Sequence, residues 1–443
     1  MTDARRTLRL GLLLTLPAVT LTACGGTGTA ARTTAGSGTG TISIWAHQGQ
    51  DSENTALQNA VASFNSSQSE VKATLKFVPE KDYTKTLTAT SASALPDVLE
   101  FDGPAMASFV YNHKLAPVTD YLSPGTVANA TDAIKAQSTL DGKLYGLGIY
   151  DSGLGIYGNK KLLDAAGVKY PTGLDDPWTA ADFTAALQKL AAANPSHKAL
   201  DVKEDYGLAT EWGSYGFSPI VWSAGGALIK QGKAAGALDT PAVAGAFKTF
   251  QSWRPAIDPD TDGNAFANGR VALSWSGHWS YPAYSKAIGS DLVVLPLPDF
   301  GSGPKTGQGS WAWGIGAGSK NAKAAGKFLD YLMGDTNVSA MTNANGAVPA
   351  TKTVLSSSPL YKPGGPLHLF AQGLSQPCGD SDINKSCVAV TRPVTAGYPV
   401  ITAQFSQALN AVYGGADPQS ALTKAARAID QDFSDNNGYS LSK

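Results

Sequence analysis

Tryptophan is the most informative residue type in this chain of 443 residues, which contains nine tryptophans. Several of them stand among glycine and serine rather than among aliphatic residues, namely Trp212, Trp275, Trp279, Trp311 and Trp313. An indole presents a broad apolar face that can cover the C–H face of a sugar ring. Tryptophans in such surroundings favour the wall of a binding cleft, although each of them could equally be structural.

Carboxylates and a histidine follow several predicted strands, and they could form hydrogen bonds with the hydroxyl groups of a sugar. In open α/β sheets, ligands bind beyond the carboxyl ends of the strands. This rule points to residues 47–53, which run from His47 to Glu53, and to Asp102 and Asp151. A hydrogen bond from a hydroxyl to such a charged group contributes about 1.5–3 kcal/mol. The alternative is that the aspartates cap turns or helices and that His47 is a satisfied loop residue.

An alternation of predicted strands and helices positions these residues. Strands are expected at 41–46, 71–78 and 97–102, and helices at 53–65, 83–93 and 105–112. Further helices are expected at 180–193, 241–254, 322–333, 399–413 and 418–433. Strands that alternate with helices predict parallel sheets covered on both faces.

The stretch 141–168 marks a crossover between two halves of the chain. Asp141 and Gly142 predict a turn, and short apolar runs broken by glycine flank Asp151. A helix over residues 160–166 then ends at Gly167, where a C-terminal glycine belongs. A carboxylate between two short strands midway along the chain predicts a hinge between two lobes, with a polar group in the gap.

Length and charge agree with this division. A chain of 443 residues is too long for one compact core and suits two domains. We expect an N-terminal lobe of residues 41–149 and 292–345, and a C-terminal lobe of residues 150–291 and 346–443. The apolar stretch 292–297 suits the return crossover. The net charge is −1 and no basic cluster occurs, which argues against nucleic acid as a partner.

The first residues predict export. Three arginines precede a short apolar run at 10–21, which is too short to span a bilayer. Residues 21–24, Leu-Thr-Ala-Cys, match a bacterial lipobox, so we expect residues 1–23 to be removed and Cys24 to carry lipid. Residues 24–40 are rich in glycine and threonine and suit a flexible tether. An ordinary signal peptide with an incidental cysteine is the alternative, and the twin-arginine route stays open beside the general one.

Two further cysteines, Cys378 and Cys387, lie nine positions apart in a polar loop. Export favours a disulfide between them. Zinc is disfavoured, since no histidine lies within ligand spacing. Aspartate-rich stretches at 258–263 and 380–384 resemble the start of a calcium loop, but the glutamate that such a loop needs is replaced by Gly269 in the first of them. We therefore predict no metal.

A family resemblance extends from residue 41 to about residue 433 and is most specific at 96–102, 141–167, 265–279 and 309–321. The motif DGK-x-YG, followed by a polar residue, a tyrosine and a helix that ends in Ala-Gly, resembles the family 1 extracellular solute-binding proteins of ABC sugar importers, of the maltose and trehalose/maltose type. The resemblance implies the type II periplasmic-binding-protein fold. In that α/β fold two lobes, each a mostly parallel sheet covered by helices, are joined by a hinge. No cofactor is implied.

The same resemblance implies a set of ligand-binding residues. They are Glu53, Asp102, Asp151, Tyr215, Trp279, Gly309, Ser310, Trp311 and Arg392. Further candidates are His47, Lys85, Trp212, Trp275 and Trp313. Arg392 could instead form a surface ion pair, and Lys85 could be solvated. The late tryptophan of the maltose type is replaced at residues 400–402 by Val-Ile-Thr, which favours a short ligand.

These features together predict an exported, monomeric lipoprotein receptor that closes two lobes on a carbohydrate and delivers it to the permease subunits of an ABC transporter. It would contact the membrane surface through its lipid anchor only. A secreted glycoside hydrolase is the alternative, since carboxylates and tryptophans also line hydrolase clefts. The catalytic motifs GxSxG and HExxH are absent from the sequence. A polyol or glycerol-phosphate ligand also stays open, as does a surface adhesion protein without a small ligand.

Overall fold

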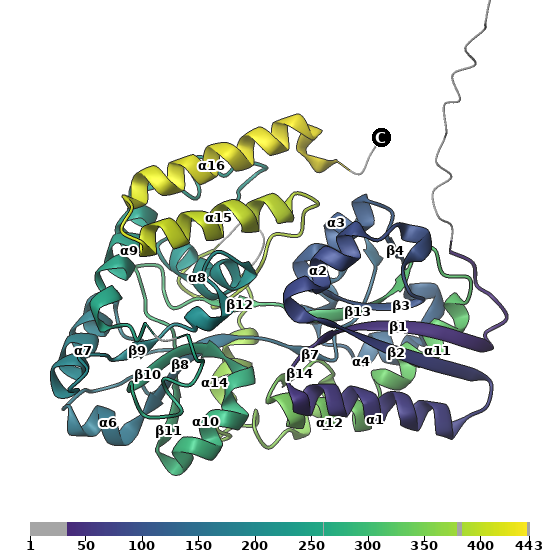
Figure 1. Cartoon of the computed structure of the whole chain (residues 1–443), viewed down its shortest axis with the longest axis horizontal. Helices are drawn as coiled ribbons and strands as arrows, with labels where there is room; N and C mark the ends of the chain where they lie inside the picture. Colours follow the sequence, from purple (N-terminus) through teal and green to yellow (C-terminus); the bar gives the residue numbers. More distant parts are fainter. Residues whose placement is uncertain (1–32, 260, 379–382, 441–443) are drawn as a thin grey trace, which may run out of the picture. The chain divides into compact units, whose positions relative to one another are not determined.

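The computed structural model describes residues 33–259, 261–378 and 383–440. This body is one compact unit that contains two larger β-sheets, each covered by helices (Figure 1). We call the part built on the five-stranded sheet the first lobe and the part built on the four-stranded sheet the second lobe. No helix within the described ranges is long and apolar enough to cross a membrane. The predicted signal sequence and Cys24 lie outside the described residues.

The sheet of the first lobe has the strand order β2–β1–β3–β13–β4. Its strands are β1 (Gly40–Gln48), β2 (Val71–Pro79), β3 (Val98–Asp102), β4 (Leu115–Ala116) and β13 (Trp311–Gly316). Its main helices are α1 (Asp51–Ser67), α2 (Glu80–Ala89), α3 (Met106–Tyr111), α11 (Ala322–Leu332) and α12 (Asp335–Asn345). Ile42 and Ile44 of β1 are buried in one core with Phe64 of α1 and Phe328 of α11. The alternation of apolar residues along β1 thus directs one face of the sheet onto helices.

The sheet of the second lobe has the strand order β11–β8–β10–β9. Its strands are β8 (Leu154–Asn159), β9 (Leu200–Asp201), β10 (Leu273–Gly277) and β11 (Leu292–Leu295). Its main helices are α7 (Ala180–Ala193), α8 (Glu211–Ser223), α9 (Pro241–Ser252), α15 (Tyr398–Tyr413) and α16 (Pro418–Asp435). Trp222, Phe247 and Phe405 belong to the large core between these helices.

Both sheets are mixed, whereas the sequence predicts mostly parallel ones. β1 is parallel to β2 and β3, but β13 is antiparallel to β3 and β4. In the other sheet β8 is antiparallel to both β10 and β11. The chain passes from one lobe to the other twice, and β8 and β13 are the first sheet strands after these two passages. Each of them therefore runs antiparallel to its neighbours in its new sheet.

Local sequence explains where several helices begin. Thr179 and Asp182 form a complete capping box at the start of α7, as the sequence predicts for a helix in this place. Asp417 accepts a hydrogen bond from the backbone N–H of Ser420, and Pro418 occupies the first position of α16. Thr210 caps α8 by accepting a hydrogen bond from the N–H of Trp212, which fixes the position of Glu211 in the first turn.

Two short ladders connect the lobes. β7 (Tyr150–Asp151) is antiparallel to β14 (Val348–Pro349), and β12 (Thr306–Gln308) is parallel to β15 (Ala389–Thr391). The predicted return crossover at 292–297 is wrong, because this stretch contains β11, which pairs with β8 at the edge of the second sheet. An apolar run next to proline is also typical of an edge strand. The return to the first lobe comes later, between β12 and β13.

The remaining elements are short. The helices are α4 (Pro124–Asn129), α5 (Asp132–Gln137), α6 (Lys160–Ala165), α10 (Tyr281–Ile288), α13 (Lys352–Ser357) and α14 (His368–Leu374), and β5 (Thr139–Leu140) pairs with β6 (Lys143–Leu144). The disulfide expected in the polar loop joins Cys378 to Cys387. It lies just before β15, which leads to Arg392.

Candidate functional site

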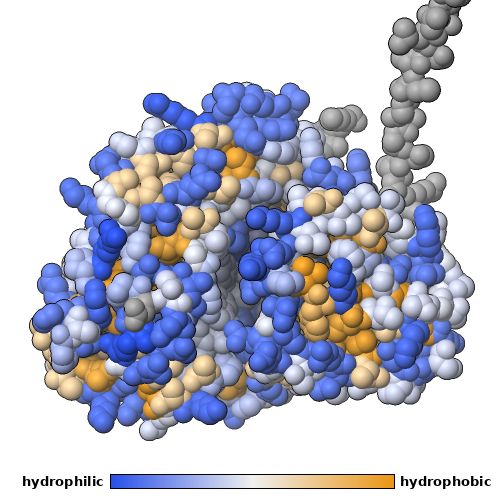
Figure 2. All heavy atoms as spheres, viewed as in Figure 1, coloured by the Kyte–Doolittle hydropathy of each residue, from blue (hydrophilic) through white to orange (hydrophobic). Residues whose placement is uncertain are grey.

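Figure 2 shows a groove between the two lobes. Residues of both lobes meet at Arg392, which follows β15 and is only 4% exposed. Its guanidinium donates two hydrogen bonds to Asp102 at the end of β3, from Nη1 to Oδ2 at 3.1 Å and from Nη2 to Oδ1 at 3.0 Å. Nη1 also donates to Oε1 of Glu211 in α8 at 2.7 Å. Arg392 therefore links a carboxylate of each lobe, through bidentate geometry on one side.

This ionic cluster, formed by Asp102, Glu211 and Arg392, is shaped by burial. Burial by itself lowers the pKa of Arg392, but the charge of Asp102, followed by smaller effects that include Glu211, raises it well above its usual range. Burial raises the pKa of the Glu211 carboxyl, although Arg392 opposes that effect. Because two carboxylates share one guanidinium, the ionised cluster keeps one excess negative charge. Such a cluster suits ligand groups that donate hydrogen bonds, such as hydroxyls.

An aromatic wall lies next to the ionic cluster in the second lobe, and we define it as Trp212, Tyr215 and Trp279. The guanidinium carbon of Arg392 lies 4.6 Å from the centre of the Tyr215 ring. The Tyr215 and Trp212 rings each lie 6.1 Å from Trp279, between centroids. Trp212 and Tyr215 are buried, whereas Trp279 is partly exposed. Trp279 is therefore the ring of this wall that stays open at the surface, and the other two rings pack against it.

The position of Trp279 depends on a glycine. A Cβ atom at Gly277 would lie 2.2 Å from a ring carbon of Trp279, a distance that real Cβ contacts do not reach. Any side chain at this position would push the indole away. The sequence Gly277-His278-Trp279 thus couples the end of β10 to the orientation of the indole.

The first lobe contributes a different wall. The indole of Trp311, at the start of β13, is stacked on the imidazole of His47, with the ring centres 3.9 Å apart and the planes at 9°. His47 Nδ1 lies 2.8 Å from Oε2 of Glu100 in β3. Burial by itself lowers the pKa of His47, but the charge of Glu100 and the hydrogen bond to it raise this pKa to about 9. The imidazole of His47, paired with Glu100, therefore covers one face of the Trp311 indole.

Glu53 lies in the first turn of α1 and is partly exposed. Its Oε1 accepts a hydrogen bond from the hydroxyl of Tyr150 at 2.6 Å and one from the Nδ2 amide of Asn345 at 3.4 Å. A carboxylate in the first turn also interacts favourably with the helix dipole. Glu53 thus stands at the junction of α1, the hinge strand β7 and α12.

Asp151 is buried in the hinge, with 3% of its surface exposed. Its Oδ1 accepts hydrogen bonds from the backbone N–H groups of Ser152 at 2.8 Å and Gly309 at 3.1 Å. The side-chain amide of Gln308 donates to Oδ2 at 3.0 Å and to Oδ1 at 3.2 Å. Burial raises the pKa of the Asp151 carboxyl, while these hydrogen bonds lower it in part. Asp151 therefore connects two of the strands that join the lobes.

The loop 309–311 is fixed from the first lobe. Ser310 donates its backbone N–H to Oε1 of Gln137 at 2.9 Å and accepts from Nε2 of the same amide at 2.9 Å. Gly309 has a φ of +109°, and a Cβ atom there would lie 2.3 Å from Gln137 Oε1, so glycine is required for conformation and for space. The Gly309 carbonyl accepts from Arg392 Nη2 at 3.3 Å.

Ser152 and His278 complete the hinge. Nε2 of His278 lies 2.9 Å from Oγ of Ser152, and Nδ1 lies 3.3 Å from the carbonyl oxygen of Asn345. Burial lowers the pKa of His278 to about 4. The imidazole thus links Ser152, whose hydroxyl donates to Oγ of Ser310 at 3.0 Å, to the carbonyl of Asn345.

One buried polar atom of the ionic cluster, Nε of Arg392, has no hydrogen-bond partner within the described part of the chain. An unpaired buried polar atom costs about 1–3 kcal/mol. The guanidinium of Arg392 therefore keeps a donor that the described residues do not use.

The sequence of residues 59–363, more than half of the chain, matches the bacterial extracellular solute-binding proteins. The chain belongs to this family. Its members are exported binding proteins rather than enzymes.

Known relatives and solved structures agree with that membership. The solute-binding protein is 26% identical to the maltodextrin-binding protein MdxE of Bacillus subtilis (strain 168) over 62% of this chain and 68% of the relative. A similar fold occurs in the cyclic α-maltosyl-1,6-maltose binding protein of Arthrobacter globiformis, with a TM-score of 0.69, 23% identity and coverage of 89% of this chain and 98% of that one. The GacH receptor of Streptomyces glaucescens GLA.O has a TM-score of 0.72, 21% identity and coverage of 91% and 100%. The fold is therefore the two-lobed type II fold.

Two predicted ligand residues of the solute-binding protein are buried in the cores of the lobes. Trp275 is fully buried in the core of the second lobe, where its indole N–H donates to the carbonyl of Gly216 at 2.9 Å. Trp313 is 1% exposed in the core of the first lobe. Lys85 is exposed on α2. Glycine and serine next to a tryptophan therefore do not by themselves mark a cleft, because in strands β10 and β13 they allow close packing.

In the aspartate-rich stretch 258–263, two carboxylates pair with an arginine. Arg270 donates to Oδ2 of Asp258 at 3.2 Å and to Oδ1 of Asp262 at 2.6 Å, so a guanidinium compensates these carboxylates. Asp260 and most of the stretch 380–384 lie outside the described residues. Within the described ranges, no group of three or more potential metal ligands occurs.

Sequence reasoning missed four groove or hinge residues, namely Gln137, Glu211, Gln308 and His278. Each lies far along the chain from its partner: Glu211 is 181 positions from Arg392, and Gln308 is 157 from Asp151. The only local signal was at Glu211, which follows the helix-capping Thr210 and so stands in the first turn of an aromatic-rich helix.

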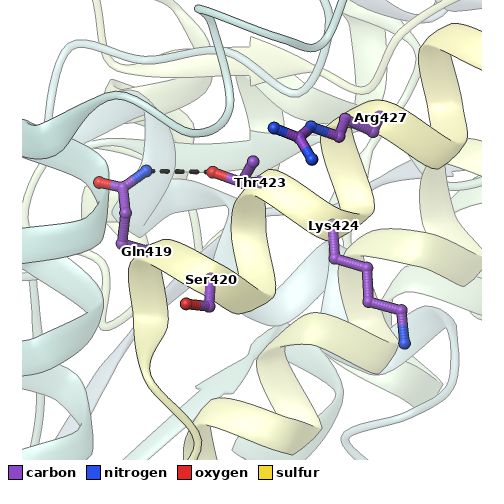
Figure 3. A pocket seen from close by; sticks show the side chains of 5 residues that line it. All are labelled: Gln419, Ser420, Thr423, Lys424 and Arg427. Carbon is purple, nitrogen blue, oxygen red and sulfur yellow. Dashed lines mark hydrogen bonds between the residues drawn. The ribbon is translucent and has the colours of Figure 1, made fainter.

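A separate hollow lies on the outer side of α16 of the solute-binding protein (Figure 3). It is lined by Gln419, Ser420, Thr423, Lys424 and Arg427, and Gln419 donates to the hydroxyl of Thr423 at 3.2 Å. All five residues belong to one helix, so the hollow has no opposing wall. It contains none of the residues of the ionic cluster or the aromatic wall.

Proposed function

We propose that this solute-binding protein binds an oligosaccharide of the maltodextrin type in the groove between its lobes. The observation that carries the proposal is the aromatic wall beside the ionic cluster, where the guanidinium carbon of Arg392 lies 4.6 Å from the centre of the Tyr215 ring. The aromatic wall suits the C–H face of a sugar ring, and the cluster suits its hydroxyl groups.

The names of the similar proteins support the sugar class. The Bacillus subtilis relative is a maltodextrin-binding protein. The Arthrobacter globiformis protein binds cyclic α-maltosyl-1,6-maltose, and the Streptomyces glaucescens receptor has been solved in complex with acarbose. All three names refer to ligands built on sugar rings.

Within this proposal the residues divide by role. Trp279 and Tyr215 stack on the sugar from the second lobe, and Trp311 faces it from the first. Glu53, Asp102 and Arg392 pair with hydroxyl groups, as does Glu211. Gly309 and Ser310 position Arg392 and the hinge. Asp151 acts as a positioning residue, since its oxygens already accept four hydrogen bonds from the protein.

The transport role follows from the fold. Hinge rotation would close the lobes over the sugar, and the closed form would be recognised by the permease of an ABC transporter. We further propose that the protein acts as a monomer, anchored to the outer face of the cytoplasmic membrane through a lipid on Cys24. Cys24→Ala should release the protein from the membrane fraction or leave it unprocessed.

A thermal-shift panel tests the proposal. Maltose, maltotriose, trehalose, cellobiose and glycerol 3-phosphate are added to the purified, processed protein. A ligand at about 100 times its dissociation constant should add about 2.7 kcal/mol to the free energy of unfolding. We expect a shift with the α-linked glucose oligomers. A shift with glycerol 3-phosphate alone would contradict the sugar assignment, and release of glucose on prolonged incubation would indicate a hydrolase.

A further inference from the structure

Tyr206 is the one large hydrophobic side chain that is exposed among the residues that the structure describes, with 36% of its surface accessible. It ends the short 3₁₀ helix η4 (Glu204–Tyr206), between β9 and α8. The roles assigned above do not include it. Large aromatic side chains are normally buried at least in part, so an exposed one beside a binding groove requires an explanation.

Tyr206 continues the aromatic wall beyond Trp279. The indole N–H of Trp279 donates a hydrogen bond to the Tyr206 hydroxyl at 3.2 Å. The Tyr206 ring also stands edge-on to Trp212, with the ring centres 5.5 Å apart and the planes at 89°. Trp212 thus contacts both rings, and Tyr206 lies next to the ring that we propose to stack on a sugar.

The turn that carries Tyr206 is rigidly held. Lys203 has a left-handed backbone, with a φ of +56°, and its N–H donates to Oδ1 of Asp201 at 2.7 Å. Its buried ammonium donates to the carbonyl of Gly263 at 2.9 Å and lies 4.8 Å from the centre of the Tyr206 ring. A non-glycine residue in this conformation persists only where surrounding contacts impose it. The exposed ring is therefore preorganised, which lowers the entropic cost of binding to it.

A carboxylate lies next to this ring. Asp205 precedes Tyr206 and pairs with Lys203 at 3.2 Å. Burial raises the pKa of the Tyr206 hydroxyl, and the charge of Asp205 raises it further. Asp205 is therefore a charged hydrogen-bond acceptor beside the exposed ring.

We propose that Tyr206 forms an additional saccharide subsite, which stacks on the sugar unit beyond the one on Trp279. Asp205 accepts hydrogen bonds from the hydroxyls of that unit. The inference rests on the proposed function of the same groove and deepens it, because the subsite selects longer oligosaccharides over disaccharides. The sequence predicts a short ligand because the late tryptophan is missing at residues 400–402. The proposed subsite changes that expectation, because Tyr206 supplies an aromatic ring at another place in the groove.

The test is calorimetric titration with linear α-1,4-linked glucose oligomers of two to five units. The parent is compared with Tyr206→Ala, Tyr206→Phe and Tyr331→Ala, the last on α11, where Tyr331 packs against Phe64 outside the groove. In the parent, affinity should rise when a third or fourth unit is added. For oligomers with this added unit, Tyr206→Ala should bind about tenfold more weakly than the parent, while its affinity for maltose should stay the same. Tyr206→Phe, which keeps the ring, should retain most of the rise.

The outcomes separate the two levels of the proposal. If the parent binds maltose and Tyr206→Ala weakens all lengths equally or none, the additional subsite is contradicted. If the parent binds none of these oligomers, the proposed function itself is contradicted, whatever the variants do. Circular dichroism of each variant checks that the fold is intact, and Tyr331→Ala shows how much the loss of a partly buried tyrosine of the first lobe changes affinity.

Discussion

The hinge and the aromatic wall both contain residues that the sequence marks as ligand-binding, yet their polar atoms are used differently. In the hinge, both oxygens of Asp151 accept hydrogen bonds from Ser152, Gln308 and Gly309. Beside the wall, Arg392 Nε finds no partner in the described structure. A carboxylate whose lone pairs are used by the protein stabilises the fold, whereas an unpaired atom gains most from a ligand. The comparison thus separates positioning residues from binding residues.

Asp151→Ala should have the largest effect of these substitutions, on stability. If it did not, the distinction between the hinge and the aromatic wall would be wrong. The substitution leaves two backbone N–H groups and one amide without an acceptor in a buried site, which should lower the free energy of unfolding by about 3–5 kcal/mol. Urea denaturation measures it. Asp151→Asn, which keeps one acceptor oxygen, should cost less. Unchanged stability together with lost sugar binding would make Asp151 a ligand residue.

The hinge should also weaken in acid through His278. Burial lowers the pKa of His278 from 6.5 to about 4, so the folded protein holds it neutral and the unfolded chain binds the proton first. Its contribution is therefore fully present above pH 6.5 and is lost as the pH falls towards 4, by about 3 kcal/mol in total.

Urea denaturation at several pH values between 4 and 7 tests this prediction against His278→Asn. The variant should show a flatter pH dependence over that window. His47→Gln should leave the acid limb in place, because the raised pKa of His47 makes that residue titrate on the alkaline side. An equal slope in the parent and in His278→Asn would show that other groups cause the acid sensitivity.

Trp279→Ala should have the smallest effect of these substitutions. It tests the aromatic wall, whereas the preceding variants test the hinge. Its indole is partly exposed, so its loss should cost about 2 kcal/mol of sugar binding, roughly 30-fold, and less stability than Asp151→Ala. Calorimetric titration with the sugar from the thermal-shift panel measures the affinity. Trp275→Phe is the matched control, since Trp275 is buried and should lose stability but keep affinity. Parent-like affinity of Trp279→Ala would remove the aromatic wall from the site.

Local sequence is enough for the features that depend on neighbours in the chain. The capping box at Thr179 and the cap at Asp417 predict where α7 and α16 begin, because each side chain bonds to a backbone N–H three residues on. The pair Cys378 and Cys387 is close in sequence and forms a disulfide. The DGK-x-YG motif and its continuation indicate the family and hence the two-lobed fold.

Tertiary structure alone decided which of two similar tryptophans could meet a ligand. Trp275 and Trp279 are four positions apart, and each is followed by a serine. Trp275 lies within β10, and its place in the pairing with β8 directs its side chain into the core. Trp279 lies beyond the end of β10, so the alternation of side chains between the two faces of the sheet does not fix its direction. Likewise, Asp102 and Arg392 meet across 290 positions because the chain crosses between the lobes and returns. Sequence names such residue types, but the pairing of distant segments determines which of them face the groove.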